Sequence, residues 1–258
     1  MPGPEDDLAL LISAAERAGE IAGRYFRQDP QIWDKGVDGP VTEADFEIDA
    51  MLRDTLLGAR PEYGWLSEET EDDPARLSAE TLFICDPIDG TRAFIDGEPS
   101  FSHSLAVVHQ GKVTAGVVFL PMRDKLYAAA SGRGSTLNGV PVHVTGAQEL
   151  AQSTFLATKG ALKPEHWPGG IPEINRAYRP SLAYRMSLVG EGRFDGMMTF
   201  RPTWEWDIAA GTLIIEEAGG RATTGRGAPL VFNGPTAQVD GVLAGSSTVH
   251  GALVAQRR

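Results

Sequence analysis

Cysteine is almost absent from this chain of 258 residues, because Cys85 is the only one. A single cysteine can form no internal disulfide and no zinc site built from several thiolates. We therefore expect a protein of the reducing cytoplasm. The chain also has no run of eighteen apolar residues, so we expect no membrane span. Its acidic N-terminus, residues 1–7, lacks the basic and then apolar pattern of a signal peptide.

Positive charge is scarce as well. The chain has 23 lysines and arginines against 35 acidic residues, which gives a formal net charge of −12. Such a balance argues against a surface that binds nucleic acid. An acidic enzyme can still act on a phosphate ester if bound cations supply positive charge locally. The histidines form no metal-binding set, and we assign all of them to surface or packing positions: His103, His109, His143, His166 and His250.

Helical and strand patterns alternate along the chain without a clean βαβ repeat. Apolar spacing predicts a helix over residues 7–26, and Thr42, with Asp45 three positions later, is a capping signal for a second helix over 43–57. β-Branched runs between polar turns predict an antiparallel meander. We expect strands at 104–109, 113–120, 125–130, 140–144, 154–157 and 194–200, helices at 181–190 and 207–218, and loops at 29–40 and 159–172. The pattern favours α/β layers with a mixed sheet, in one unit over 1–258 with approximate halves 1–150 and 151–258.

The segment Asp86-Pro87-Ile88-Asp89-Gly90-Thr91 carries the strongest chemical signal. It follows an apolar run, residues 81–85, with the composition of a buried strand. The proline and the glycine predict a tight turn that aims Asp86, Asp89 and the Ile88 carbonyl at one point. Oxygen-only ligands suit a hard divalent cation such as Mg²⁺. The Thr91 hydroxyl could then sit beside a metal-bound water, as expected of a metal-assisted phosphate hydrolase.

Other acidic positions are candidates for the same site. Asp207 opens a strongly helical segment, where a carboxylate serves equally well as an N-cap. Small residues early in that helix would let it approach another backbone, which brings Asp207 near Asp86. The pair Glu68-Glu69 follows an apolar strand end, which suggests that one glutamate points inward, although such pairs are often solvated. Asp45 is equally well explained as a helix cap.

Four segments, in the same order and spacing, resemble the inositol monophosphatase superfamily. They are Val41-Thr42-Glu43-Ala44-Asp45, Trp65-Leu66-Ser67-Glu68-Glu69, Asp86-Pro87-Ile88-Asp89-Gly90-Thr91 and Trp206-Asp207-Ile208-Ala209-Ala210-Gly211. The resemblance implies an αβαβα sandwich of the inositol monophosphatase and fructose-bisphosphatase type. It also implies an Mg²⁺-dependent and often lithium-sensitive phosphomonoesterase that acts on a small phosphate ester. Dimers are common in similar proteins, so a homodimer is a further expectation.

The resemblance assigns the metal ligands residue by residue. Glu68, Asp86 and the Ile88 carbonyl would hold one Mg²⁺. Asp86, Asp89 and Asp207 would hold a second. A third and weaker ion would contact Glu68 and waters, so two or three ions are expected.

The resemblance also assigns the catalytic and substrate contacts. Thr91, paired with Asp45, would orient and help to deprotonate a metal-bound water, and Glu68 belongs to the same catalytic set. The amides of Gly90 and Thr91 would bind phosphate oxygens. The residues expected to contact the substrate are Asp89, Gly90, Thr91, Arg185 and Asp207.

The branch of the family, and with it the substrate, is less constrained. In inositol-specific members, a glutamate seven residues before the second-motif aspartate reads sugar hydroxyls, and here that position is Phe200. The segment Pro202-Thr203-Trp204-Glu205-Trp206-Asp207 instead resembles the 3′(2′),5′-bisphosphate nucleotidase branch, in which a lysine stands at the place of Arg185. A cation there could grip a second phosphate. A surface arginine on a helix explains Arg185 equally well.

Several alternatives stay open at this point. Residues 86–94 also resemble the first motif of the histidinol-phosphatase branch, so histidinol-phosphatase and inositol monophosphatase remain candidates. A protein of a different class, which binds metal or phosphate without catalysis, would keep the same acidic residues. Trp204 and Trp206 could stack on a nucleobase or simply pack at the entry to the helix.

Overall fold

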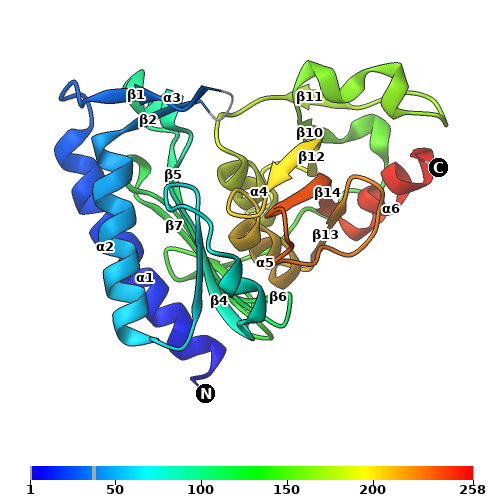
Figure 1. Ribbon diagram of the computed structural model, residues 1–258. Coiled ribbons are helices and arrows are strands. Elements are labelled where there is room, and N and C mark those ends of the chain that lie inside the picture. The colour runs from blue at the N-terminus through cyan, green and yellow to red at the C-terminus, as the bar shows by residue number, and fades with distance from the viewer. Residues whose placement is uncertain (1, 37–38, 258) are drawn as a thin grey trace.

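The computed structural model describes residues 2–36 and 39–257 (Figure 1). Its layers follow one another as a helix pair, a seven-stranded sheet, a second helix pair, a five-stranded sheet and the C-terminal helix. This order confirms the αβαβα sandwich expected from the sequence. None of the described helices combines the length and the apolar character that a membrane crossing requires.

The seven-stranded sheet follows the chain from one edge to the other. Its strands are β3 (Gly64–Ser67), β4 (Thr81–Asp89), β5 (Ser102–His109), β6 (Lys112–Leu120), β7 (Lys125–Ala130), β8 (Ser135–Leu137) and β9 (Val140–Val142). Neighbours are antiparallel except β3 and β4, which are parallel. The predicted meander from β5 to β7 is confirmed. Cys85, near the end of β4, is fully buried.

The five-stranded sheet is mixed and has the order β11-β10-β12-β14-β13. Its strands are β10 (Thr154–Leu156), β11 (Asn175–Ala177), β12 (Gly196–Trp204), β13 (Gly220–Thr224) and β14 (Gln238–Ser246). A short ribbon of β1 (Ile32–Asp34) and β2 (Pro40–Thr42) lies beside the seven-stranded sheet (Figure 1). This ribbon lies where a loop was predicted, and residues 37 and 38 of that loop lie outside the described ranges.

The helices are α1 (Pro4–Tyr25), α2 (Glu43–Ala59), α3 (Thr91–Ile95), α4 (Leu182–Gly190), α5 (Ala209–Glu217) and α6 (Ser247–Gln256). The helices α1 and α2 pack on the outer face of the seven-stranded sheet, and α4 and α5 lie between the two sheets (Figure 1). Every residue of α4 is buried, and α5 is buried except near its C-terminal end. Helices that are apolar all round are expected where both faces are covered.

Local signals located most of these elements, and three of the boundaries that differ from the prediction affect the site. Strand β4 continues through Asp89 instead of ending at Cys85. Helix α5 begins at Ala209 with Ile208 as its N-cap, so Asp207 precedes the helix and does not cap it. Strand β12 runs four residues beyond its predicted end at Phe200. Strand β14 and helix α6 were not predicted.

Candidate active site

A bulge near the end of β4 brings Asp86 and Asp89 together. Asp86 pairs with Ser104 on β5 and Asp89 pairs with Ser102, so three steps along β4 match two steps along β5. Side chains three positions apart on a regular strand point to opposite faces. The extra residue of a bulge removes that offset. The two carboxylates therefore converge through a bulge within the strand, and the predicted turn between them is wrong.

The chain turns one residue later, at Gly90. Its φ angle is 102°, and a Cβ atom there would lie 3.5 Å from the Cα of Phe101. Glycine adopts this left-handed conformation without a steric penalty. Helix α3 begins at Thr91, whose hydroxyl donates a hydrogen bond of 3.1 Å to the carbonyl of Ile88. Gly90 and Thr91 both line the cleft described below, and phosphate binding by their amides stays a prediction.

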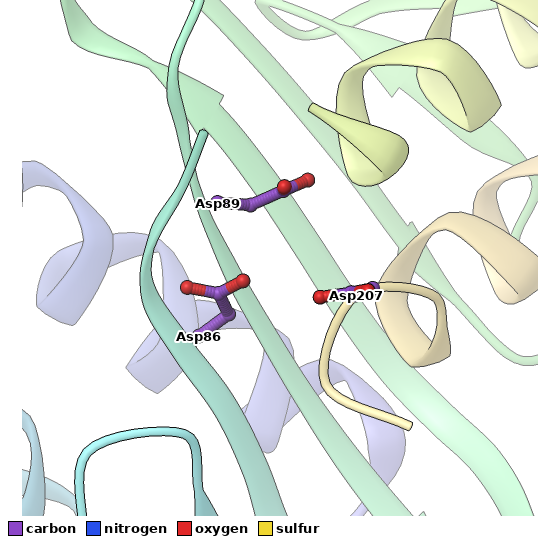
Figure 2. A group of neighbouring side chains, drawn as sticks. All are labelled: Asp86, Asp89 and Asp207. Atoms are coloured by element: carbon purple, nitrogen blue, oxygen red, sulfur yellow. The ribbon is translucent and has the colours of Figure 1, made fainter. Parts of the chain in front are cut away.

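Asp207 reaches the same point from the segment between β12 and α5 (Figure 2). Carboxylate oxygens of Asp86, Asp89 and Asp207 lie within 4.8 Å of one another. All three side chains point into a common space (Figure 2). The structure thus brings together two aspartates of the first motif and one of the second.

The surroundings of this cluster make its carboxylates hard to ionise together. Burial, the charge of Glu68 and then the charge of Asp89 raise the pKa of Asp86 well above its usual range. Burial, followed by the charges of Asp89 and Glu68, does the same to the pKa of Asp207. Mutual repulsion of this kind indicates a place for a cation.

The start of α4 supports Asp89 from the other side. The Ser181 hydroxyl and the Ala183 amide each donate a hydrogen bond of 2.7 Å to Oδ2 of Asp89. These bonds oppose the effect of burial, and the pKa of Asp89 is raised to about 6. Ser181 also caps α4 by accepting a hydrogen bond from the Tyr184 amide at 3.0 Å. Helix α4 therefore fixes the direction in which Asp89 points.

The donor set fits a hard divalent cation. Both carboxylate oxygens of Asp86 are buried and have no hydrogen-bond partner within residues 2–36 and 39–257. Buried polar atoms without a partner are rare in folded proteins, and a cation would provide one. Asp86, Asp89, Asp207 and the nearby Ile88 carbonyl offer oxygen only, which suits Mg²⁺. The identity and the number of the ions stay predictions.

Glu68 lines the same cleft as the three aspartates, and Lys35 forms an ion pair with Glu68. The Nζ atom of Lys35 lies 2.9 Å from Oε1 of Glu68 and 2.8 Å from Oε1 of Glu69. Burial and the charge of Glu68 raise the pKa of Glu69 to about 7. Asp49 of α2 accepts hydrogen bonds from the hydroxyls of Ser67 and Thr70, which flank the two glutamates in the sequence. Lys35 was missed, because it falls in a segment that carried only loop signals.

Asp45 is buried and caps α2, as its spacing from Thr42 predicts. Its Oδ2 accepts hydrogen bonds from the amide and the hydroxyl of Thr42, at 2.8 and 2.6 Å. Its Oδ1 has no partner in the described part of the chain, and burial raises its pKa to about 6. No direct hydrogen bond joins Asp45 to Thr91 in that same part of the chain. Their pairing around a water stays a prediction.

A cleft of about 340 Å³ opens over the carboxylates. Its charged lining residues are Glu68, Asp86, Asp89, Asp207, Arg92, Arg185 and Arg201. In the ranges that the structure describes, none of these three arginines forms an ion pair with a carboxylate. The cleft thus presents acidic groups and unpaired guanidinium groups together.

Arg185 is a buried residue of this cleft, and its interpretation as a surface arginine is wrong. Its exposed fraction is 6%. Its guanidinium lies over the ring of Tyr178, 4.5 Å from the centroid, and its Nε donates to the carbonyl of Arg179. Burial lowers the pKa of Arg185, but a guanidinium keeps its charge at neutral pH.

Arg201 of β12 lines the cleft, and the neighbouring Phe200 does not. Phe200 packs instead against His166 and Trp167, with ring centroids 4.9 and 5.4 Å away. The pairing of β12 with β14 is irregular between Thr199 and Pro202, which affects the face that each residue presents. The position expected to read sugar hydroxyls therefore lies outside the cleft. Arg201 was missed, although Pro202 is a sequence signal for the irregularity, because a proline cannot donate to the ladder of an interior strand.

Trp204 and Trp206 stack on each other. Their ring centroids are 4.6 Å apart and their planes differ by 11°. Both line the cleft, but Trp206 is buried and Trp204 only partly so. The packing interpretation is therefore correct for Trp206. Trp204 is the more exposed of the two at the cleft.

Comparison with known proteins gives a consistent result over most of the chain. The model of the inositol monophosphatase family matches residues 4–258. An inositol-1-monophosphatase from Rhizobium meliloti is 36% identical over 238 residues, which cover 86% of this chain and 88% of that protein. A histidinol-phosphatase from Chlorobaculum parvum is 33% identical over 234 residues, which cover 88% and 89% of the two chains.

Solved structures agree in fold. The extragenic suppressor protein suhB from Bartonella henselae superposes with a TM-score of 0.84 at 27% identity, over 98% of both chains. SaIMPase-II with 2′AMP bound gives a TM-score of 0.83 at 25% identity, over 96% of this chain and 92% of that one. The same protein has also been solved with inositol monophosphate bound.

Proposed function

Because this chain belongs to the inositol monophosphatase family and is a metal-dependent phosphatase, we propose that it is an Mg²⁺-dependent phosphomonoesterase for a 3′(2′),5′-bisphosphate nucleotide. One observation supports the reaction above all others, namely the carboxylates of Asp86, Asp89 and Asp207 within 4.8 Å of one another. A second observation supports the substrate, namely that Arg185 and Arg201 line the same cleft and form no ion pair with a described carboxylate.

The chain's own residues suit the reaction. Bound Mg²⁺ would neutralise phosphate oxygens and lower the pKa of a coordinated water. Asp86, Asp89 and Asp207 would hold one ion, and Glu68 would help to hold another with Asp86 and the Ile88 carbonyl. Two or three ions are proposed.

Thr91 and Asp45 would handle the water and its proton. The Thr91 hydroxyl donates a hydrogen bond to the Ile88 carbonyl. The lone pairs of the Thr91 oxygen are therefore free to accept a hydrogen bond from the attacking water. The unpartnered Oδ1 of Asp45, with a pKa of about 6, suits a group that accepts a proton near neutral pH. The amides of Gly90 and Thr91 would orient the phosphate.

The arginines distinguish among the candidate substrates by charge. Mg²⁺ would offset the carboxylates, whereas Arg185 and Arg201 have no carboxylate partner among the described residues and would face the leaving group. An anionic leaving group, such as a nucleotide with a second phosphate, gains charge-assisted hydrogen bonds there. The amine of histidinol would be repelled, and a neutral inositol ring would gain less. SaIMPase-II, a similar protein, has been solved with 2′AMP bound and with inositol monophosphate bound, so it binds both a nucleotide and a polyol ester.

A substrate panel tests the proposal. The purified protein with Mg²⁺ is given 3′-phosphoadenosine 5′-phosphate, fructose 1,6-bisphosphate, histidinol phosphate and inositol 1-phosphate, and phosphate release is measured. The nucleotide should have the highest kcat/KM. Arg201→Gln and Arg185→Gln should each lower that value about 10- to 100-fold, as expected when a hydrogen bond to a charged group is lost, and should leave inositol 1-phosphate nearly unaffected.

The control is Arg53→Gln, which removes an exposed arginine of α2 outside this cleft and should change no rate. A preference for inositol 1-phosphate that survives both cleft substitutions would refute the nucleotide assignment. A cytoplasmic location, a homodimer and sensitivity to lithium stay predictions, and the location rests on the single buried cysteine.

A further inference from the structure

We infer that His103 is a positioning residue that holds the metal-binding bulge of β4 in shape through the backbone carbonyl of Pro87. The inference rests on the proposed metal-dependent function. His103 lies on β5 and is fully buried. Its neighbours Ser102 and Ser104 pair with Asp89 and Asp86, so His103 stands opposite the two bulged residues, Pro87 and Ile88. Its Nδ1 contacts the Pro87 carbonyl oxygen.

The bulge explains why this carbonyl needs a side-chain donor. A bulge removes the extra residue from the hydrogen-bond ladder of the sheet. Pro87 has no N–H group, so only its carbonyl must be satisfied. All of β4 is buried, and a buried carbonyl without a donor is costly. The imidazole of His103 replaces the missing ladder bond.

The protonation state of His103 fits this role. Burial lowers its pKa to about 4, so the ring is neutral near pH 7 and carries one N–H. The Pro87 carbonyl can only accept, which places that hydrogen on Nδ1. The Nε2 atom is then an acceptor, and no described residue donates to it. An aliphatic side chain would fill the space between the nearby Phe101 and Phe119 rings without this cost, so packing alone does not account for the histidine.

The contact between His103 and Pro87 affects the proposed metal ligands on both sides of Pro87. The direction of its carbonyl sets the peptide plane between Pro87 and Ile88, and with it the angle at which Asp86 and Asp89 converge. If the contact with His103 is lost, that peptide can rotate and the carboxylates can separate. The expected effect is weaker metal binding in a protein that still folds.

A matched pair of substitutions tests the role of the donor. His103→Asn places an amide nitrogen close to the position of Nδ1, and His103→Leu keeps a similar branched shape without a donor. Titration calorimetry measures the binding of Mg²⁺ to each metal-free protein, and thermal unfolding is followed in parallel. The leucine variant should bind Mg²⁺ about tenfold or more weakly, as expected when a residue that supports a metal ligand is lost. The asparagine variant should keep most of the affinity.

Equal Mg²⁺ affinity in the leucine variant and the unaltered protein overturns the inference, and so does equal loss in both variants. If the leucine variant does not fold, His103→Gln replaces it, because its amide lies one bond further out and cannot reach the Nδ1 position. Binding of Mg²⁺ to the unaltered protein tests the proposed function separately. Absence of that binding overturns both, whereas its presence with no effect at His103 overturns only the inference.

Discussion

The hydroxyl of Ser104 donates a hydrogen bond of 2.9 Å to the backbone carbonyl of Trp206. Ser104 is also the residue of β5 that pairs with Asp86. One buried serine therefore ties the strand that carries Asp86 to the segment that carries Asp207. The two halves of the acidic cluster are held together through this bond as well as through packing.

Ser104→Ala should loosen this connection. Loss of the bond should lower the free energy of unfolding by about 1 kcal/mol and weaken Mg²⁺ binding roughly tenfold, as measured by thermal unfolding and calorimetry. Ser135→Ala is the matched control, because the buried Ser135 hydroxyl has no hydrogen-bond partner in the described ranges. Identical behaviour of the two variants would show that the Ser104 bond does not hold the cluster.

Asp207→Asn should abolish turnover and yet stabilise the metal-free protein. The charges of Asp89 and Glu68 oppose ionisation of Asp207, and a neutral amide removes that repulsion. Loss of a residue that only supports a metal ligand lowers activity roughly 10- to 100-fold. Loss of Asp207, a proposed ligand itself, should lower the rate of phosphate release further. Tm without metal should rise. Unchanged turnover in the folded variant would exclude Asp207 from the reaction.

The stabilising effect of Mg²⁺ should depend on pH. Without metal, the pKa of Asp89 is about 6 and the pKa values of Asp86 and Asp207 are raised well above the usual range, whereas unfolded aspartate titrates near 3.9. Because the folded state binds these protons more tightly, their contribution to stability is fully present below about pH 3.9 and is lost as the pH rises through the folded-state pKa values. Mg²⁺ bound to the ionised carboxylates would offset that loss.

The increase in Tm caused by Mg²⁺ should therefore be small at about pH 5 and larger at about pH 7.5. His103 titrates in the opposite sense, but its contribution is largely common to the samples with and without metal. A Tm increase of the same size at both pH values would contradict the assignment of the ion to these carboxylates. Asp207→Asn should reduce the effect at the higher pH.

Gly90→Ala should disturb both stability and activity. A Cβ atom at φ 102° is strained, with a cost of about 1–3 kcal/mol, and it would lie against Phe101 beside the cleft. Gly132→Ala is the control, because Gly132 has a φ of 75° and open space around it. Both variants should have a lower Tm, and only Gly90→Ala should lose phosphate release. Full activity of Gly90→Ala would remove Gly90 from the site.

Features that depend on neighbours in sequence could be predicted. Thr42 and Asp45 lie three residues apart, and their capping contact is local. The strands of the meander alternate with short turns, so β5, β6 and β7 could be located closely. Strand β14 was missed, because its buried part is rich in glycine and alanine and no short turn links it to either of its partners, β12 and β13.

Features that depend on strand register could not be predicted. The spacing of Asp86 and Asp89 indicated a shared target, but the bulge that achieves it exists only in the pairing of β4 with β5. A shift of one residue exchanges the two faces of a strand, and the irregular end of β12 makes Arg201 rather than Phe200 a cleft residue. Lys35 lies in the connection between β1 and β2, a ribbon that local signals did not indicate, and reaches Glu68 from there.

The burial of Cys85 has an experimental consequence. It is the only cysteine, it is fully enclosed, and it is bonded directly to Asp86. Burial raises the pKa of its thiol, so a thiol-specific reagent can modify it only after β4 detaches from its neighbours. The rate of that modification in the unaltered protein therefore reports the opening of the strand that carries the proposed metal ligands. A cation held by Asp86 and Asp207 would slow that opening.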